Sequence, residues 1–332
     1  MSNSLKVIRI EAYGEWNSYF NKCGGKSLPQ AWEYGSAKKE AEGWLPQRYI
    51  VRNENNTTIA IFQVLVKKIP FLGGVARINK GPLMIDDDLS RNNYELSICS
   101  IKAITYKLKK EKIWLLQLAP FLPPNNYIDN SLKKIGFNKR PNPPADSALV
   151  SLSGSDDDLM MRFNSKWRNL LRKGLKLGVN VKFDSQDSQF FDLLVKHYER
   201  QQKEKGFKGT SNEMLYALKS NQSEHFKFNL LVAFASDKKD AESVLGVLVV
   251  IQCHDVSEYL IGITTEKGRK MQANSVLLWN ALLEVKKNGA LWFDVGGLNE
   301  TTPKGIATFK KGMNPKFYAL TGEWRKWFLR LR

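Results

Sequence analysis

The chain has 332 residues, of which 42% are hydrophobic and 25% are charged, a composition typical of a globular protein large enough for two domains. Its 51 Lys and Arg against 33 Asp and Glu give a net charge of +18, which favours a polyanionic partner such as tRNA, a nucleotide-linked substrate or an anionic membrane. No apolar run reaches the roughly 18 residues of a transmembrane helix, and the N-terminus has no apolar signal-peptide core. We therefore expect a cytoplasmic protein, either free or bound peripherally at the inner face of the membrane.

Residues that commonly ligate metals are sparse. The three cysteines, Cys23, Cys99 and Cys253, lie far apart and form no Cys-x-x-Cys pair. The three histidines match no zinc-binding spacing. The sequence therefore predicts no disulfide framework, no metal site and no resident cofactor.

In the first half of the chain, runs rich in β-branched and aromatic residues predict strands. These runs are residues 5–13, 48–52, 58–67, 75–79 and 114–118. Helical spacing of apolar residues predicts helices that end at Gly43, Lys110 and Gly136. The acidic residues 86–88 suit a helix N-terminus, because carboxylates favour the positive end of the helix dipole. The Pro-rich residues 141–144 are typical of a linker.

The second half alternates strands and helices in a similar way. The predicted strands are residues 147–152, 179–183, 226–234, 243–253 and 259–264. The predicted helices are residues 156–177, 189–205, 213–220 and 274–288, the last of these ended by Gly289 and followed by a short apolar strand at 290–293.

The predicted helix 156–177 has an apolar stripe that includes Trp167 and Leu175, and a strongly basic face. The basic face consists of Lys166, Arg168, Arg172, Lys173 and Lys176. Five cations on one helix can bind the phosphates of tRNA or another polyanion, and they are also compatible with a plain solvent-facing surface, since phosphate contacts need no particular spacing.

The two halves repeat one order of elements: strand, turn, strand, short strand, helix, strand, short helix. Because the repeat has two copies, it predicts two duplicated domains, residues 1–145 and 146–315. Each copy combines an antiparallel meander with a parallel crossover, so the predicted fold class is α/β with mixed sheets. Residues 316–320 are strand-like, and the basic, aromatic residues 324–330 follow. We expect residues 316–332 to pack back on the first domain, while their mixed Trp and Arg also suit an anionic interface.

The stretch Phe293-Asp294-Val295-Gly296-Gly297 places an acidic residue and a Gly-Gly turn directly after a strand. Glycine lets a backbone approach a ligand closely, so the turn suits a binding site. An aspartate that only caps a tight turn gives the same pattern. The sequence Phe309-Lys310-Lys311-Gly312 follows twelve residues later.

The order and spacing of several motifs resemble the Fem-type peptidoglycan aminoacyltransferases, a two-domain branch of the superfamily of Gcn5-related N-acetyltransferases (GNAT). The motifs lie at residues 30–38, 79–82, 165–169, 274–279, 293–297 and 309–310, so the resemblance covers nearly the whole chain. It implies two tandem GNAT-like domains. It also implies an enzyme that moves an aminoacyl group from aminoacyl-tRNA to an amine on a nucleotide- or lipid-linked precursor of the cell wall or of a surface glycan.

The resemblance also implies roles for single residues near the reacting ester. Phe309 and Lys310 match the pair of the family that lies beside the donor, where Lys310 stabilises the tetrahedral intermediate or holds the 3′ end of the tRNA. Asp294 is a candidate to orient the attacking amine or to accept its proton. Gly296 and Gly297 form the adjoining substrate-binding turn.

For the acceptor, the resemblance points to Lys38, which matches a lysine that meets phosphates or peptide, and to Tyr259, which matches a tyrosine that faces the acceptor. Solvent exposure for Lys38 and core packing for Tyr259 are the alternatives.

Two other functions remain open. The first is acyl-CoA-dependent N-acylation of an amino sugar in polysaccharide biosynthesis, although residues 269–274 lack the glycines with which GNAT enzymes cradle the CoA pyrophosphate. The second is a non-catalytic protein that binds nucleic acid or a membrane surface. The sequence predicts an amide-forming acyltransferase without identifying the transferred group.

Overall fold

The computed structural model describes residues 5–24, 27–71, 73–85, 91–142, 146–184, 188–207, 209–235, 241–300 and 302–328. The acidic residues 86–88 and residues 143–144 of the Pro-rich stretch lie outside these ranges. No helix within them is long and apolar enough to cross a membrane. The chain divides into two compact units, residues 1–146 with 318–332, and residues 147–317.

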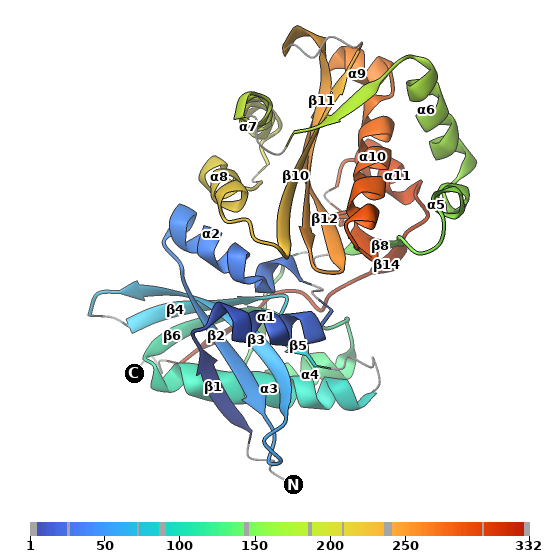
Figure 1. The fold of residues 1–332 in the computed structure, drawn as a ribbon. Coiled ribbons are helices and arrows are strands. Elements are labelled where there is room, and N and C mark those ends of the chain that lie inside the picture. Colours follow the sequence, from blue (N-terminus) through green and yellow to red (C-terminus); the bar gives the residue numbers. More distant parts are fainter. Residues whose placement is uncertain are drawn as a thin grey trace. The chain divides into compact units, whose positions relative to one another are not determined.

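The first unit is built on an eight-stranded sheet with the order β1-β2-β3-β4-β6-β15-β7, in which β5 pairs with β3 (Figure 1). Its strands are β1 (Lys6–Ile10), β2 (Leu45–Arg52), β3 (Thr58–Ile69), β4 (Gly73–Asn79), β5 (Leu83–Met84), β6 (Ile113–Ala119), β7 (Asn138–Lys139) and β15 (Trp324–Trp327). Its helices are α1 (Tyr13–Lys22), α2 (Trp32–Glu42), α3 (Arg91–Lys110) and α4 (Asn126–Lys134). Among the described strand pairs of this first sheet, only β4 and β6 run parallel.

The second unit is built on a seven-stranded sheet with the order β14-β8-β13-β12-β11-β10-β9. Its strands are β8 (Ser147–Ser151), β9 (Asn180–Phe183), β10 (Phe226–Phe234), β11 (Val244–Cys253), β12 (Val256–Thr264), β13 (Trp292–Asp294) and β14 (Lys316–Tyr318). Its helices are α5 (Asp156–Arg162), α6 (Ser165–Lys176), α7 (Ser188–Lys205), α8 (Asn212–Ser220), α9 (Glu266–Lys270), α10 (Ala273–Lys287) and α11 (Lys304–Lys311).

Two helical layers enclose the sheet of the second unit. Helix α10 packs on β10 and β11 and is itself covered by α6, while α7 packs on β11 and β12 on the other side (Figure 1). The central strand β11 is buried along its whole length, as expected for a strand with helices on both faces. A large cluster of buried side chains in this unit joins α10 to α6, β11 and β13.

The predicted repeat is confirmed. The order β2-β3-β4-α3-β6-α4 of the first unit recurs in the second as β10-β11-β12-α10-β13-α11, and each copy contains one parallel strand pair. The predicted class of mixed α/β sheets is therefore confirmed as well.

The predicted single helix 156–177 is wrong, because two helices occupy this range. Phe163 and Asn164 are extended, with ψ of 149° and 156°, and the Asn164 side chain accepts a hydrogen bond from the N–H of Trp167 at 2.8 Å. This N-cap starts a new helix, a role that asparagine fills well. Leu175, predicted for the apolar stripe, is 50% exposed.

Two further elements differ from expectation. Helix α1 was not predicted, although Trp16 and Phe20 form its buried face four residues apart. The basic, aromatic C-terminal residues form β15, which lies between β6 and β7 with Trp324 fully buried. Trp324 is therefore a core residue and no part of an anionic-interface tail.

Candidate functional site

In the second unit a parallel strand pair comes apart. Strands β12 and β13 pair only from Val256–Trp292 to Glu258–Asp294, although β12 continues to Thr264. In the first unit the equivalent strands β4 and β6 stay paired as far as Asn79 and Ala119. The second unit therefore leaves the edge of β12 beyond Glu258 without its parallel neighbour.

Strand β12 is also irregular where the pairing ends. Val249 of β11 lies opposite Ile261 and Val250 lies opposite Tyr259, so Leu260 is an extra residue in the ladder. Such bulges bend a strand and are common beside active sites, because they re-aim the neighbouring side chains.

The turn after β13 is built on Asp294, which is 5% exposed. Its Oδ1 accepts hydrogen bonds from the N–H of Gly296, at 2.9 Å, and from the hydroxyl of Ser147, which also lies 2.9 Å from the Gly296 carbonyl oxygen. Gly296 has φ of +74°, where a Cβ would lie 3.0 Å from the carbonyl oxygen of Tyr259. The carboxylate therefore fixes the Gly-Gly turn, which is the capping role that the sequence left open.

Lys310, near the end of α11, meets this turn. Its side chain is 8% exposed, and its Nζ donates a hydrogen bond to the carbonyl oxygen of Gly297 at 3.2 Å. Burial lowers its pKa from 10.5 to about 8, and the nearby carboxylates of Asp294 and Glu258 act in the opposite direction. Beside it, a Cβ on Gly297 would meet nothing within 4 Å. The Lys310 ammonium, which is only partly protonated near pH 8, thus lies beside the open space next to Gly297.

Helix α11 is held in place by the start of α6. The N–H of Asn164 donates to the carbonyl oxygen of Gly312 at 3.0 Å, and a Cβ on Gly312 would lie 2.9 Å from the Trp167 ring. Phe309 packs on the same ring at 5.9 Å between centroids. Phe309 therefore lies at the rim of the core, while the next residue, Lys310, faces the turn.

Tyr259 forms one wall beside Lys310. The Lys310 ammonium lies 5.2 Å from the centre of the Tyr259 ring, within the range of a cation–π contact. Burial raises the pKa of Tyr259 to about 12, and Tyr198 of α7 adds to this shift, so the phenol stays protonated at neutral pH. The structure thus brings Tyr259, Lys310, Asp294 and Gly296 together, and the roles predicted for them stay predictions.

The position of the Tyr259 ring depends on Gly262, which leads to a prediction. A Cβ at residue 262 would overlap the Tyr259 hydroxyl. We expect Gly262→Ala to displace the ring, to cost about 1–3 kcal/mol of stability and to lower the acyl transfer expected from the sequence about tenfold. Removal of the hydroxyl in the Gly262→Ala, Tyr259→Phe double variant should restore most of the stability, as measured by thermal unfolding. A single Gly262→Ala variant with wild-type stability and transfer rate would contradict this role.

The five cations on the basic face of α6 differ in their surroundings. The Nη1 of Arg168 donates to the carbonyl oxygens of Met161 and Phe163, at 3.1 and 2.6 Å, so Arg168 closes the end of α5. The other four cations of this face are exposed: Lys166, Arg172, Lys173 and Lys176. Arg168 is therefore a structural residue, and the remaining four are available at the surface.

Lys38 lies in the first unit, on α2. Its ammonium pairs with Glu42 one turn later at 2.5 Å and lies 5.7 Å from the centre of the Tyr34 ring. The side chain is 16% exposed. Its predicted contact with the acceptor stays a prediction.

In the turn that leads into α10, where the sequence lacks CoA-type glycines, three amides are bonded within the chain. The N–H groups of Met271, Gln272 and Ser275 donate to the carbonyl oxygens of Lys267, Arg269 and Gln272 at 3.0–3.2 Å. Gln272 is in the left-handed region with φ of 60°. Amides that are already bonded within the chain are poorly placed to cradle a pyrophosphate.

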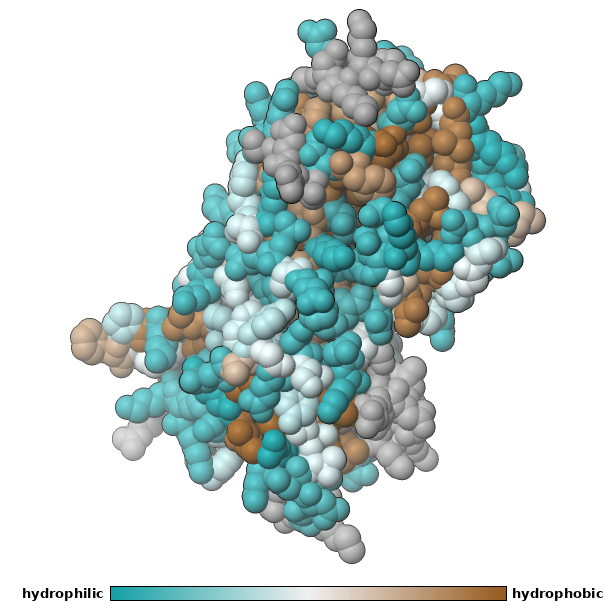
Figure 2. Space-filling model, in the orientation of Figure 1, coloured by the Kyte–Doolittle hydropathy of each residue, from teal (hydrophilic) through white to brown (hydrophobic). Residues whose placement is uncertain are grey.

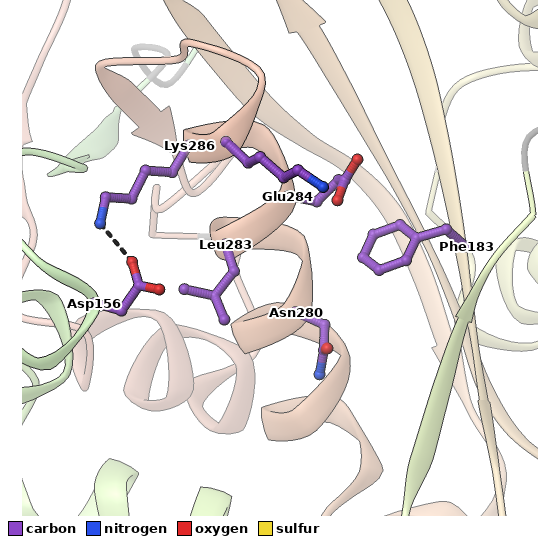
Figure 3. A pocket seen from close by; sticks show the side chains of 7 residues that line it. Asp156, Phe183, Asn280, Leu283, Glu284 and Lys286 are labelled. Atoms are coloured by element: carbon purple, nitrogen blue, oxygen red, sulfur yellow. Dashed lines mark hydrogen bonds and ion pairs between the residues drawn. The ribbon is translucent and has the colours of Figure 1, made fainter.

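A groove of about 490 Å³ opens on the outer side of α10 (Figure 3). Figure 3 shows Lys286 turned toward Asp156 of α5, with which it pairs at 2.5 Å, while Phe183 of β9 lies on the opposite side. None of the predicted site residues is among its lining residues, which are Asp156, Phe183, Asn280, Leu283, Glu284, Lys286 and Lys287. Within the described ranges, no group of three or more His, Cys, Asp and Glu side chains could hold a metal ion.

Sequence reasoning missed four residues that build the site: Ser147, Asn164, Tyr198 and Gly262. Ser147 and Asn164 are polar residues at element ends, a weak signal that many turns share. Gly262 interrupts an otherwise β-branched strand, and an isolated glycine in a strand does indicate close approach by another group.

Three comparisons with known proteins bear on this arrangement. Residues 161–311 match the sequence model of the acetyltransferase (GNAT) domain. The crystal structure of FemX matches with a TM-score of 0.76 at 17% identity, over 97% of each chain. A tandem GNAT protein from the clavulanic acid biosynthesis pathway, solved without AcCoA, matches with a TM-score of 0.58 at 12% identity, over 99% of this chain and all of its own. L-PGS from Bacillus licheniformis matches with a TM-score of 0.53 at 11% identity, over 96% and 93%. No curated protein matches the sequence significantly.

Proposed function

Since the chain has the tandem GNAT fold and carries a GNAT domain over residues 161–311, we propose that it is an acyltransferase that forms an amide, with aminoacyl-tRNA as the donor. The observation that carries this proposal is the buried Lys310 beside the Gly-Gly turn, where β12 and β13 part. The fold alone does not specify a reaction, so the proposal rests on the chemistry of this site.

The proposed reaction is a direct attack of an amine on an ester. The acceptor nitrogen bonds to the carbonyl carbon of the aminoacyl ester, and negative charge develops on the carbonyl oxygen. Collapse of this intermediate breaks the C–O bond to the ribose of the tRNA. The ribose oxygen leaves as a hydroxyl with the proton that the amine loses. No covalent enzyme intermediate is needed, so the protein has to position the reactants and stabilise the oxyanion.

Lys310 suits the stabilising role. A lysine has three N–H donors, and the Gly297 carbonyl oxygen takes one of them. In a poorly solvated position, a cation acts on a developing oxyanion more strongly than it would in water. Asp294 then supports the site indirectly: it fixes the turn and favours the protonated form of Lys310.

Two observations favour tRNA over acyl-CoA. The amides of Met271 and Gln272, just before α10, and of Ser275 in its first turn are bonded within the chain, which weakens the case for a pyrophosphate cradle. The net charge of +18 and the four exposed cations of α6 fit a large polyanion. The match to an acetyltransferase domain favours acyl-CoA and keeps that donor as the second candidate.

For the acceptor we propose an amine on a nucleotide-linked or lipid-linked precursor of the cell wall or of a surface glycan. Lys38 is proposed to bind its phosphates and Tyr259 to face its reacting end. Phe309 is proposed to flank the donor ester.

The donor assay tests the function directly. Wild-type protein would receive either labelled aminoacyl-tRNA or labelled acyl-CoA, together with nucleotide-linked peptide, lipid-linked precursor or amino sugar acceptors. We expect label in an alkali-stable amide with tRNA only. Transfer from acyl-CoA alone would establish the second candidate. A protein that binds tRNA but transfers from neither donor would be a non-catalytic binder.

The α6 surface gives a separate prediction on tRNA binding. We expect a variant with Lys166→Gln, Lys173→Gln and Lys176→Gln to bind tRNA at least tenfold more weakly at low salt. The slope of log K against log salt should fall by roughly two to three, since each phosphate contact contributes about 0.7–0.9. Filter binding between 50 and 300 mM salt measures both quantities. A matched control replaces Lys267, Lys270 and Lys287 of the same unit, and equal losses in both variants would show diffuse attraction only.

A further inference from the structure

Phe71, in the turn between β3 and β4, is the starting point of a second functional surface. Its side chain is fully exposed, at 106%, and its backbone has φ of +63°. Left-handed backbone is unusual for a bulky residue, and full exposure of an aromatic ring is unfavourable in water. Neither feature contributes to the packing of the first unit, so both suggest that the ring has a partner outside the chain.

The neighbours of Phe71 divide into apolar and basic groups. Pro70 is exposed and Ile69 is half-buried, so residues 69–71 form a small apolar tip, called here the hairpin tip. Lys67 and Lys68 precede it and are both exposed. Figure 2 shows brown, apolar atoms at the left edge of the first unit, where Figure 1 places the turn that joins β3 to β4.

The end of the sheet beside the hairpin tip also combines aromatic and basic side chains. The carbonyl oxygen of Lys112 accepts a hydrogen bond from Gly74 at 3.1 Å, so the turn that leads into β6 lies directly against the hairpin. The Lys112 side chain is exposed. Trp327, 49% exposed, stacks on Trp114 at 5.3 Å between ring centres.

Helix α3 ends at the same edge. Tyr106 is 62% exposed, and the Lys110 ammonium lies 4.4 Å from the centre of its ring. Two of the described glutamates lie in this region. Glu111 is bonded to Tyr49 at 2.8 Å and to Lys107 at 3.4 Å. Glu42, whose backbone carbonyl oxygen accepts a hydrogen bond from Lys67 at 3.3 Å, pairs with Lys38. The edge therefore presents aromatic side chains among lysines, and both carboxylates are already paired within the chain.

We propose that this edge of the first unit docks on an anionic lipid bilayer, with Phe71 inserted among the acyl chains and Lys67, Lys68, Lys110 and Lys112 at the headgroups. An apolar tip flanked by lysines and by interfacial Trp and Tyr side chains complements the boundary of such a bilayer. Single-stranded RNA instead requires a basic groove with aromatic platforms. A protruding Ile-Pro-Phe tip offers no groove, so a lipid surface is the favoured partner. The inference does not depend on the proposed transferase activity.

Vesicle sedimentation of the full chain tests the proposal. The lipids would be phosphatidylcholine alone, or phosphatidylcholine with 30% phosphatidylglycerol, at about 0.1 M salt, where the Debye length is about 10 Å. We expect sedimentation with the anionic vesicles only. Phe71→Ser should weaken this binding at least tenfold, and a variant with Lys67→Gln, Lys68→Gln and Lys112→Gln should weaken it further and flatten its salt dependence.

The matched controls distinguish docking through the hairpin tip from a general attraction of the basic protein to anionic vesicles. Phe317→Ser removes another exposed phenylalanine, 55% exposed in the second unit, and should leave vesicle binding unchanged. Circular dichroism and thermal unfolding would show that Phe71→Ser folds as the wild type does. Unchanged vesicle binding by Phe71→Ser, or equal losses in both phenylalanine variants, would overturn the proposal. A tRNA affinity that falls with Phe71→Ser while vesicle binding stays would assign the edge to RNA and overturn it equally.

Discussion

Replacement of Lys310 by methionine is expected to lower kcat/KM for acyl transfer by about 10²–10³-fold, the usual loss when one oxyanion donor is removed. The affinity for the donor should change little, because the proposed contact forms mainly in the transition state. Steady-state rates with labelled donor and direct binding measurements would separate the two effects. Lys311→Met, which removes the exposed neighbour on the same helix, is the matched control and should keep full activity.

The same variant is expected to be more stable than the wild type at neutral pH. The folded pKa of Lys310 is about 8 and the ordinary value is 10.5, so the unfolded chain binds more protons between these values. Stability of the wild type is therefore penalised below pH 8 and recovers as pH rises toward 10.5. Lys310→Met removes a penalty of about 3 kcal/mol at pH 7 and almost none near pH 10.5. Equal unfolding temperatures of the two proteins at pH 7 would argue against a buried cation.

The pH dependence of catalysis distinguishes whether Lys310 acts as a cation or as a proton acceptor. If Lys310 acts as a cation, kcat/KM should fall as pH rises through about 8, where half of the side chains lose their proton. Lys310→Arg keeps the charge and should lack this descending limb, whatever activity it retains. A profile that instead rises through pH 8 in the wild type, and is flat in Lys310→Arg, would assign proton acceptance to Lys310.

Trp324→Ala is expected to cost about 3–5 kcal/mol, because it empties a large, fully buried site on the strand next to the edge of the first sheet. Strand β15 pairs with β6 from Trp324–Leu118 to Trp327–Leu115 and with β7 through Trp324 and Arg325. Loss of Trp324 therefore weakens two ladders as well as the core cluster. Denaturant unfolding combined with amide exchange should locate the loss in the first unit.

Trp327→Ala is the matched control for this prediction. Trp327 lies on the same strand but is 49% exposed, and its ring stacks on Trp114. We expect its replacement to cost no more than about 1–1.5 kcal/mol. Comparable losses from both variants, or less than 1 kcal/mol from Trp324→Ala, would mean that β15 contributes little to the first unit.

The tandem GNAT fold was accessible from the sequence through element order and through motif spacing. Runs of β-branched residues indicate strands such as β3 and β11. The length of the apolar pattern and Gly289 at its end indicate α10. The break between α5 and α6 was not accessible, because the apolar spacing continues across it. There a single asparagine cap and the packing of Trp167 against α11 override the helical periodicity.

The sequence by itself determined the duplicated order of elements, the basic surface and the position of the Gly-Gly turn, since these are encoded by residues near one another in the chain. Only the tertiary structure decided that Lys310 is buried while Lys311 is exposed, and that Asp294 receives a hydrogen bond from Ser147, far away in sequence. Burial and long-range hydrogen bonds depend on how distant segments pack, and packing sets the pKa of a lysine. The sequence contained the lysine and the Gly-Gly turn as separate motifs, and the tertiary structure buried the lysine against that turn.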